Sequence, residues 1–142
     1  MTTQMQFARQ GVVTKEMEFV AREENLSPEF IREGVAKGTI AICCNVNHKN
    51  LKPCGVGAGL RVKVNANIGT SDSFPELAPE LGKLHAAIAS GADSIMDLST
   101  GGNITASRRA IIGASDVMVG TVPIYQVAVK TIQKYGAVVE MT

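Results

Sequence analysis

The chain has 142 residues, of which 45% are apolar and 19% are charged, and its 14 basic and 13 acidic residues leave a net charge of +1. This length and composition favour a folded domain with a real core and exclude a disordered tail or linker. The balanced charge, the lack of like-charge runs and the absence of Trp argue against nucleic acid or a membrane surface as partner. We therefore expect a small-molecule partner that binds in a pocket.

The expected compartment follows from the lack of a recognisable targeting signal and from the number of cysteines. No stretch approaches the ~18 apolar residues of a membrane span, and the first residues lack the apolar core of a signal peptide, so we expect a cytoplasmic protein. The three cysteines, Cys43, Cys44 and Cys54, are an odd number that favours reduced thiols over a disulfide framework. A ligand or reactive role for them stays open, although neighbours in a strand point to opposite faces.

The first 38 residues have the pattern of short helices. Thr14 is a capping residue for a helix over residues 15–24. Ser27 and Pro28 are the start signal of a second helix, which we expect to end at Gly38.

A short strand and a glycine-rich segment follow these helices. Residues 39–44 are a strand candidate, and residues 52–59, KPCGVGAG, have the composition of a loop. Because this glycine pattern precedes a strand instead of opening a helix, nucleotide binding there is disfavoured. We predict that residues 1–59 form an amino-terminal helical and loop segment with one short strand, and that residues 60–142 form a second part.

The stretch from Arg61 to Ser71, RVKVNANIGTS, alternates apolar and polar residues with the period of a strand. Asn65 and Asn67 fall on one face near its carboxyl end. Two interpretations are open at this point, since an ordinary polar surface strand and a strand that holds a small polar molecule have the same pattern.

Strand and helix patterns then alternate to the end of the chain. The strands are predicted at 61–71, 94–99 and 118–125, each followed by a helix, at 77–91, 103–113 and 126–135, with a possible later start for the first helix because of Pro79. This rhythm predicts a parallel α/β sheet, either doubly wound or part of an eightfold barrel. A barrel needs about 250 residues, and the apolar run at 137–142 resembles an incomplete fourth strand, so we expect the first part of a longer protein.

Polar or unusual residues gather where these strands end. Ligands of parallel sheets and barrels bind at the carboxyl ends of strands. The residues at those positions are Asn65, Asn67 and Gly69; Met96, Asp97, Ser99, Thr100 and Gly101; and Thr121, Tyr125 and Gln126. A structural role is open for each of them, such as core packing for Met96 or a turn hydrogen bond for Asp97.

Several blocks of the chain resemble the thiamin-pyrimidine synthase family, the phosphomethylpyrimidine synthases of radical S-adenosylmethionine (SAM) chemistry. The blocks are TQMQFARQGVVTKEMEFVAREEN (Thr3–Asn25), VNH (Val46–His48), VKVNANIGTS (Val62–Ser71), GADSIMDLSTGGNI (Gly91–Ile104) and VGTVPIYQ (Val119–Gln126). The resemblance implies the first three βα units of a TIM-type (βα)8 barrel, with Asn67, Met96 and Tyr125 as substrate-binding residues. The implied reaction converts aminoimidazole ribotide to hydroxymethylpyrimidine phosphate in thiamin biosynthesis.

The resemblance also implies cofactors that the motifs of this chain do not bind. They are a [4Fe-4S] cluster, S-adenosylmethionine and a second metal, zinc or iron, in a full-length protein that is a homodimer. Cys43, Cys44 and Cys54 lack the CxxC spacing of cluster ligands, so we expect this chain alone to be inactive. Two alternatives stay open: a 5-hydroxybenzimidazole synthase that acts on the same ribotide for cobamide synthesis, and a non-catalytic truncated barrel.

Overall fold

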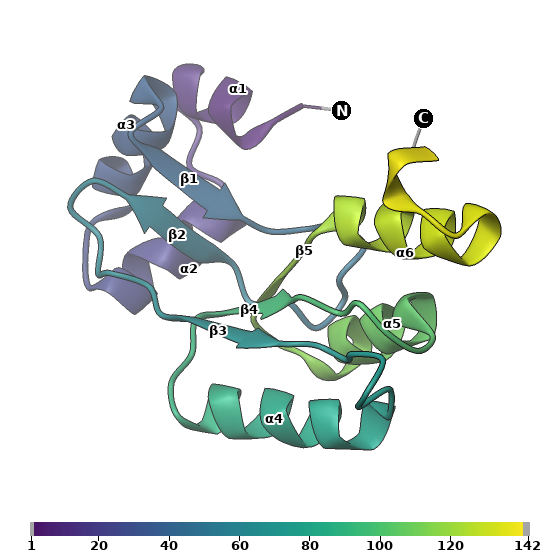
Figure 1. Ribbon diagram of the computed structural model, residues 1–142. Helices are drawn as coiled ribbons and strands as arrows, with labels where there is room; N and C mark the ends of the chain where they lie inside the picture. Colours follow the sequence, from purple (N-terminus) through teal and green to yellow (C-terminus); the bar gives the residue numbers. More distant parts are fainter. Residues whose placement is uncertain (1, 141–142) are drawn as a thin grey trace. The chain divides into compact units, whose positions relative to one another are not determined.

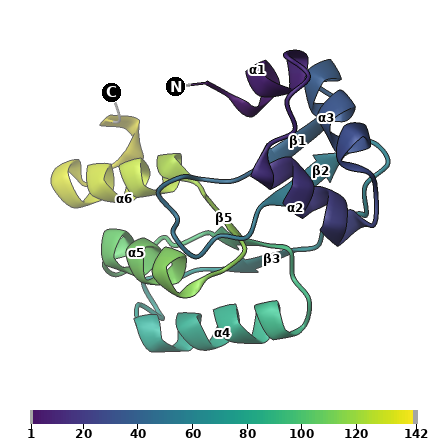
Figure 2. The same cartoon turned by 180° about the vertical axis from the view of Figure 1, so that it is seen from behind.

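The computed structural model describes residues 2–140, and the chain forms two compact units, residues 1–63 and 64–142 (Figures 1 and 2). We call them the amino-terminal unit and the carboxy-terminal unit. The domain boundary that we predict after residue 59 stays a prediction. Among the described helices, none has the length and apolar composition needed to span a membrane.

Three short helices form most of the amino-terminal unit: α1 (Gln4–Arg9), α2 (Lys15–Glu24) and α3 (Pro28–Lys37). The predicted caps are confirmed, because Thr14 and Ser27 accept hydrogen bonds from backbone N–H groups in the first turns of α2 and α3, and Gly38 ends α3 in the left-handed conformation. The helices share a buried core made of Ala8, Met17, Val20, Ala21, Ile31, Val35 and Ile40.

The same unit contains a hairpin in which β1 (Ile40–Cys43) pairs antiparallel with β2 (Cys54–Gly57). The prediction of a loop over residues 52–59 is therefore wrong for the part that forms β2. The glycines serve close packing instead: a Cβ on Gly57 would lie 2.2 Å from the Thr39 carbonyl oxygen, and one on Gly55 would lie 2.5 Å from Val20 Cγ1. At Gly57 the neighbouring atoms belong to the backbone, so a side chain does not fit there, whereas at Gly55 one would push against the Val20 and Leu60 side chains.

The carboxy-terminal unit has a three-stranded parallel sheet in the order β3 (Asn65–Ile68), β4 (Ser94–Asp97) and β5 (Met118–Thr121). The crossover helices are α4 (Leu77–Ala89) and α5 (Ile104–Ala114), and α6 (Pro123–Tyr135) follows β5 (Figure 1). The predicted parallel α/β sheet with alternating helices is thereby confirmed for these three strands.

One face of this sheet carries the core of the unit. Ile68 and Ile95 pack there with Leu84 of α4 and Ile111 of α5. Because successive strand residues point to opposite faces, Asn67 and Met96 lie on the other face. The alternation read from the sequence thus separates core residues from candidate ligand residues.

Two strand predictions extend too far. Regular pairing of the first strand covers only Asn65–Ile68 within the predicted 61–71. The third strand ends at Thr121 because Pro123 opens α6, so Tyr125 and Gln126 lie in the first turn of a helix. Proline has a fixed φ and no N–H donor, and the first helical position suits both properties.

One open point is decided in favour of the predicted start, and two smaller predictions need correction. Helix α4 begins at Leu77, before Pro79, since a proline in the first turn removes an N–H that has no helical partner. Helix α5 continues through Gly113 to Ala114. The predicted fourth strand over 137–142 contains a 3₁₀ helix at Val138–Glu140, and residues 141 and 142 lie outside the described part.

Candidate functional site

Asn67, Met96 and Gly120 form one row across the parallel sheet. The register pairs Asn67 with Met96 and Met96 with Gly120. A Cβ on Gly120 would lie 3.0 Å from Met96 Cε and 3.1 Å from its Sδ, so the thioether lies over the glycine. Two of the three predicted substrate-binding residues are therefore direct neighbours on adjacent strands.

Side-chain hydrogen bonds hold Asn67 from one side. Asn65 Nδ2 donates to Asn67 Oδ1 at 2.9 Å, and Ser94 Oγ donates to Asn65 Oδ1 at 2.9 Å. Both asparagines are exposed, and Ser94 lies directly across the ladder from Asn65. The two asparagines, separate candidates in the sequence, thus act as one hydrogen-bonded pair.

Tyr125 reaches the carboxyl edge of the sheet from a helix. It lies in the first turn of α6, four residues after the end of β5, and is 41% exposed. Its backbone therefore lies shortly after the carboxyl end of β5, and its side chain is accessible to solvent. Its role as a ligand contact stays a prediction, as do those of Asn67 and Met96.

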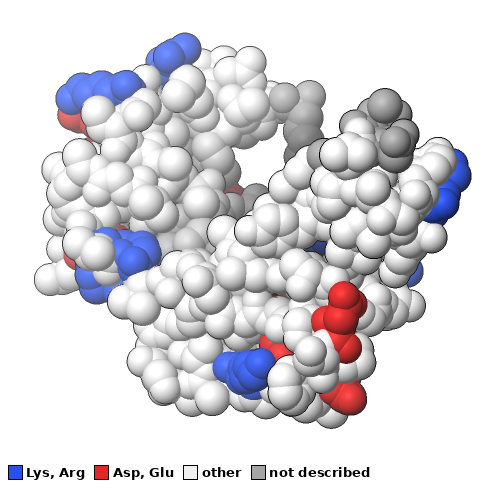
Figure 3. All heavy atoms as spheres, viewed as in Figure 1, with Lys and Arg blue, Asp and Glu red and all other residues white. Residues whose placement is uncertain are grey.

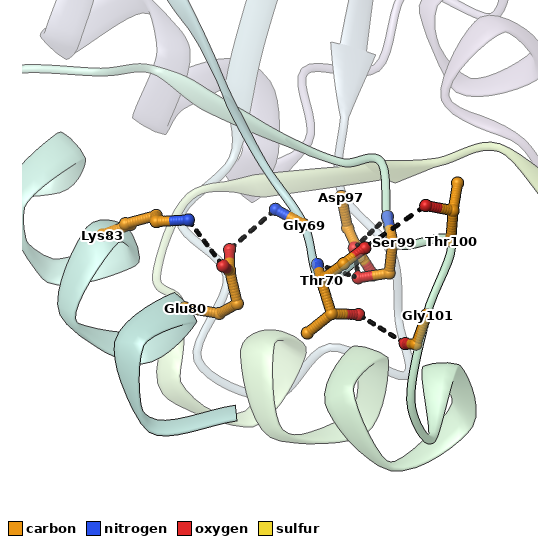
Figure 4. A network of polar contacts seen from close by, with 8 residues as sticks. All are labelled: Gly69, Thr70, Glu80, Lys83, Asp97, Ser99, Thr100 and Gly101. Atoms are coloured by element: carbon orange, nitrogen blue, oxygen red, sulfur yellow. Dashed lines mark hydrogen bonds and ion pairs between the residues drawn. The ribbon is translucent and has the colours of Figure 1, made fainter. Parts of the chain in front are cut away.

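A buried carboxylate joins the end of β3 to α4 (Figure 4). Glu80 Oε2 accepts from the backbone N of Gly69 at 2.7 Å, and Glu80 Oε1 accepts from Lys83 Nζ at 2.6 Å. The Glu80 side chain is 2% exposed, whereas Lys83 is 56% exposed. This pair fixes the backbone at Gly69, two residues after Asn67, and no sequence pattern pointed to Glu80.

A second set of bonds ties the loop after β3 to the loop after β4 (Figure 4). Asp97 Oδ1 accepts from the backbone N and the hydroxyl of Ser99, and Ser99 Oγ accepts from the backbone N of Thr70. Thr70 Oγ1 donates to the Gly101 carbonyl oxygen at 2.7 Å. Three of the predicted strand-end residues, Asp97, Ser99 and Gly101, thus meet around Thr70, but they bond to each other, to Thr70 and to backbone instead of facing outward.

The loops after β3 and β4 approach each other closely, and Asp97 is buried beneath them. A Cβ on Gly101 would lie 2.1 Å from the carbonyl carbon of Ser71, so only glycine fits there. Asp97 is 3% exposed and shares the sheet face of Ile95, and its Oδ2 has no hydrogen-bond partner within the described residues. Asp97 therefore supports the loop from the core side.

A cleft of about 360 Å³ lies between the amino-terminal end of α5 and a stretch of α6 that runs from Gln126 to Gln133. Arg108 Nη1 donates to Gln126 Oε1 at 2.9 Å, and Gln126 Nε2 donates to Thr105 Oγ1 at 2.8 Å. Gln126, a predicted strand-end residue, therefore bridges two helices. The sequence pattern did not identify Arg108 as part of this bridge. The available signal was its spacing of three residues from Thr105, which places both side chains on the same face of α5.

The cysteines and histidines do not form a metal centre in the part of the chain that the structure describes, where no group of three or more His, Cys, Asp or Glu residues is placed to hold a metal ion. Cys43 lies opposite Cys54 in the hairpin. Burial, with a smaller contribution from the Glu16 carboxylate, raises the pKa of the Cys44 thiol. The charged residues on the face shown in Figure 3 form separate groups without one dominant sign.

Comparison of the chain with known proteins identifies its family. The model of the radical SAM ThiC family matches residues 3–142. The chain is 58% identical over 139 residues to a phosphomethylpyrimidine synthase of Thermoanaerobacter sp. (strain X514), covering 98% of the chain and 32% of that relative. Phosphomethylpyrimidine synthases of Carboxydothermus hydrogenoformans and Moorella thermoacetica are 59% and 52% identical over 134 and 140 residues, which cover 94% and 99% of the chain and 31% and 32% of those relatives.

The chain thus spans about a third of the length of the curated relatives it matches. The match runs through both units and includes the row of Asn67, Met96 and Gly120. The chain belongs to the radical SAM ThiC family.

Proposed function

We propose that this chain forms part of the ribotide-binding wall of a phosphomethylpyrimidine synthase, a radical SAM lyase that converts aminoimidazole ribotide to hydroxymethylpyrimidine phosphate. The observation that carries the proposal is the row across the sheet, in which Asn67 and Met96 lie side by side on the face opposite the core. The similarity to proteins named phosphomethylpyrimidine synthase supports the same reaction.

The chemistry of the three side chains suits a ribotide. The Asn67 amide offers hydrogen bonds to an imidazole or a ribose, and the polarizable Met96 thioether packs against a ring. Tyr125, at the amino end of α6, offers an aromatic face and a hydroxyl. Together they would bind and orient the substrate.

We also propose that the carboxy-terminal unit is the first part of an eightfold barrel. The parallel order of β3, β4 and β5 and the crossover helices α4 and α5 support this architecture. The core residues Ile68 and Ile95 would face the helices, and Asn67 and Met96 would face the barrel interior.

The family's cofactors are a [4Fe-4S] cluster and S-adenosylmethionine, which supply radical chemistry when bound. The described cysteines do not fit the cluster, because Cys43 and Cys54 oppose each other in the hairpin, Cys44 directly follows β1, and the three lack the CxxC spacing of cluster ligands. We therefore assign this chain's residues to substrate binding. A second metal, zinc or iron, and a homodimer are further proposals for the full-length protein.

Product analysis tests the proposed reaction. The product of the complete gene would be reconstituted anaerobically with iron, sulfide and S-adenosylmethionine, supplied with aminoimidazole ribotide and examined by mass spectrometry. We expect hydroxymethylpyrimidine phosphate. Formation of 5-hydroxybenzimidazole would assign the protein to the cobamide branch, and a reconstituted cluster without turnover of the ribotide would contradict both enzyme assignments.

A further inference from the structure

Two consecutive hydrogen bonds lead from Ser94 through Asn65 to Asn67, and in each of them the donor is the residue further from Asn67. Ser94 Oγ donates to Asn65 Oδ1, and Asn65 Nδ2 donates to Asn67 Oδ1, each at 2.9 Å. The first bond crosses from β4 to β3, and the second runs along β3 between residues on the same face. The Asn67 amide oxygen therefore lies toward Asn65.

We propose that Asn65 and Ser94 are positioning residues that hold the Asn67 amide with its NH₂ group toward the ligand, so that Asn67 acts as a hydrogen-bond donor. The inference rests on the proposed function, since it assigns a direction to the contact between Asn67 and the ribotide.

The count of donors and acceptors supports this direction. A side-chain amide has two N–H donors and one acceptor oxygen. Asn67 Oδ1 accepts from Asn65, whereas its Nδ2 has no hydrogen-bond partner in residues 2–140. Asn67 is exposed and sits beside Met96. The Asn67 oxygen keeps a second lone pair, but it is held toward Asn65, so the groups left on the other side of the amide are two N–H donors.

A donor at this position selects the chemistry of its partner. An unprotonated ring nitrogen of an imidazole, a ribose hydroxyl oxygen or a phosphate oxygen accepts such a bond, whereas a ring N–H does not. The Asn67 donor therefore favours ligands that place an acceptor beside the Met96 thioether. A ligand that places an N–H group at that point would bring two hydrogen-bond donors, its own and that of Asn67, face to face without an acceptor. Such a ligand would bind more weakly.

Replacing Asn65 by aspartate separates the two possible directions. Aspartate is acceptor-only, so it still accepts from Ser94 but now captures the Asn67 NH₂ group and turns the amide oxygen toward the ligand. We expect the Kd for aminoimidazole ribotide, measured by calorimetry on the complete gene product, to rise at least about tenfold in Asn65→Asp. Asn65→Ala only removes the bond to Asn67 and leaves its amide free to rotate, so we expect the Kd to rise by about threefold.

Two controls accompany this pair. Ser94→Ala should raise Kd less than Asn65→Ala, because it removes the bond one step further from Asn67. The added charge of Asn65→Asp also repels the ribotide phosphate, and salt screens that repulsion. A loss of affinity that persists at high salt is expected, and a loss that disappears at high salt would overturn the proposal. If Asn65→Asp binds like the unmodified protein, the bonds run in the opposite direction and the proposal is wrong.

A ligand-free measurement keeps this inference separate from the proposed function. In ¹⁵N-labelled protein, the Asn67 side-chain amide signals can be assigned by their loss in Asn67→Asp. We expect both Asn67 amide protons to exchange rapidly with water, and one of them to be protected in Asn65→Asp. A protected Asn67 amide proton in the unmodified protein would overturn the inference even if the ribotide binds. Failure of the ribotide to bind would instead contradict the proposed function.

Discussion

The contact between Met96 and Gly120 gives a sharp prediction, because the available space is known. A Cβ on Gly120 would lie 3.0 Å from Met96 Cε and 3.1 Å from Sδ, whereas ordinary contacts are 3.4–4 Å. Gly120→Ala therefore requires the thioether to move by several tenths of an ångström. The backbone of Gly120 is not left-handed, so the space taken by the new methyl group is the only conflict.

We expect this movement to weaken ligand binding more than it lowers the stability of the fold. Methionine adapts to new packing, so we expect the free energy of unfolding in urea to change by less than about 1 kcal/mol. The Met96 methyl group would be displaced from its place over Gly120 in the row that contains Asn67, and we expect the Kd for aminoimidazole ribotide to rise about three- to tenfold. Calorimetry on the complete gene product measures this change.

Two further variants test the cause. Gly113→Ala is the matched control, since nothing lies within 4 Å of a Cβ there. It should stabilise α5 by up to about 1 kcal/mol and leave ligand affinity unchanged. Met96→Ala removes the group that Gly120→Ala displaces, so the double variant should bind no worse than Met96→Ala alone. An unshifted Met96 methyl signal in the NMR spectrum of Gly120→Ala, with unchanged Kd, would refute the reasoning.

Three other predictions concern the frame around the site and the amino-terminal unit. Ser99→Ala leaves the buried N–H of Thr70 without its acceptor and should lower the free energy of unfolding by about 1–3 kcal/mol; an unchanged urea midpoint would contradict this role. Glu80→Ala should be similarly destabilising, whereas Lys83→Ala, which changes a largely exposed partner, should cost less than about 1 kcal/mol; equal losses would be contrary to our account. Burial opposes ionisation of Glu24, but hydrogen bonds from Lys63 and the Arg61 backbone outweigh it and lower the pKa of Glu24. This stabilisation is therefore present above pH 4.5 and is lost as the pH falls through the lowered pKa. Lys63→Met should reduce the difference in unfolding free energy between neutral and acidic pH, and an unchanged difference would argue against the pair.

The sequence predicts the elements whose signals are local. The alternation of Asn65, Ala66, Asn67 and Ile68 separates the two faces of β3 correctly, because the core requires one apolar side. The helix caps at Thr14 and Ser27 are equally local and equally well predicted. The same alternation overestimates the length of β3, since Val62 and Val64 are 85% and 57% exposed and lie before the first residue that pairs with another strand among residues 2–140.

The remaining features depend on contacts between distant residues. Gly55 and Gly57 suggest a loop in sequence, but the hairpin needs them for close approach to Val20 and Thr39. Gln126 follows a predicted strand, yet its partners Thr105 and Arg108 on α5 make it a bridge between helices. The role of Glu80 could not be predicted from the sequence either, because its hydrogen-bond partner Gly69 lies eleven residues away in another part of the chain.

The central claim is that Asn67 belongs to the wall that binds the ribotide. The most direct measurement is calorimetric titration of the complete gene product with aminoimidazole ribotide, comparing the unmodified protein with Asn67→Ala, and Tyr125→Phe with Tyr135→Phe as a matched control on α6. We predict that Asn67→Ala raises Kd about tenfold and that Tyr125→Phe raises it while Tyr135→Phe does not. Unchanged affinity in both Asn67→Ala and Tyr125→Phe would contradict the account.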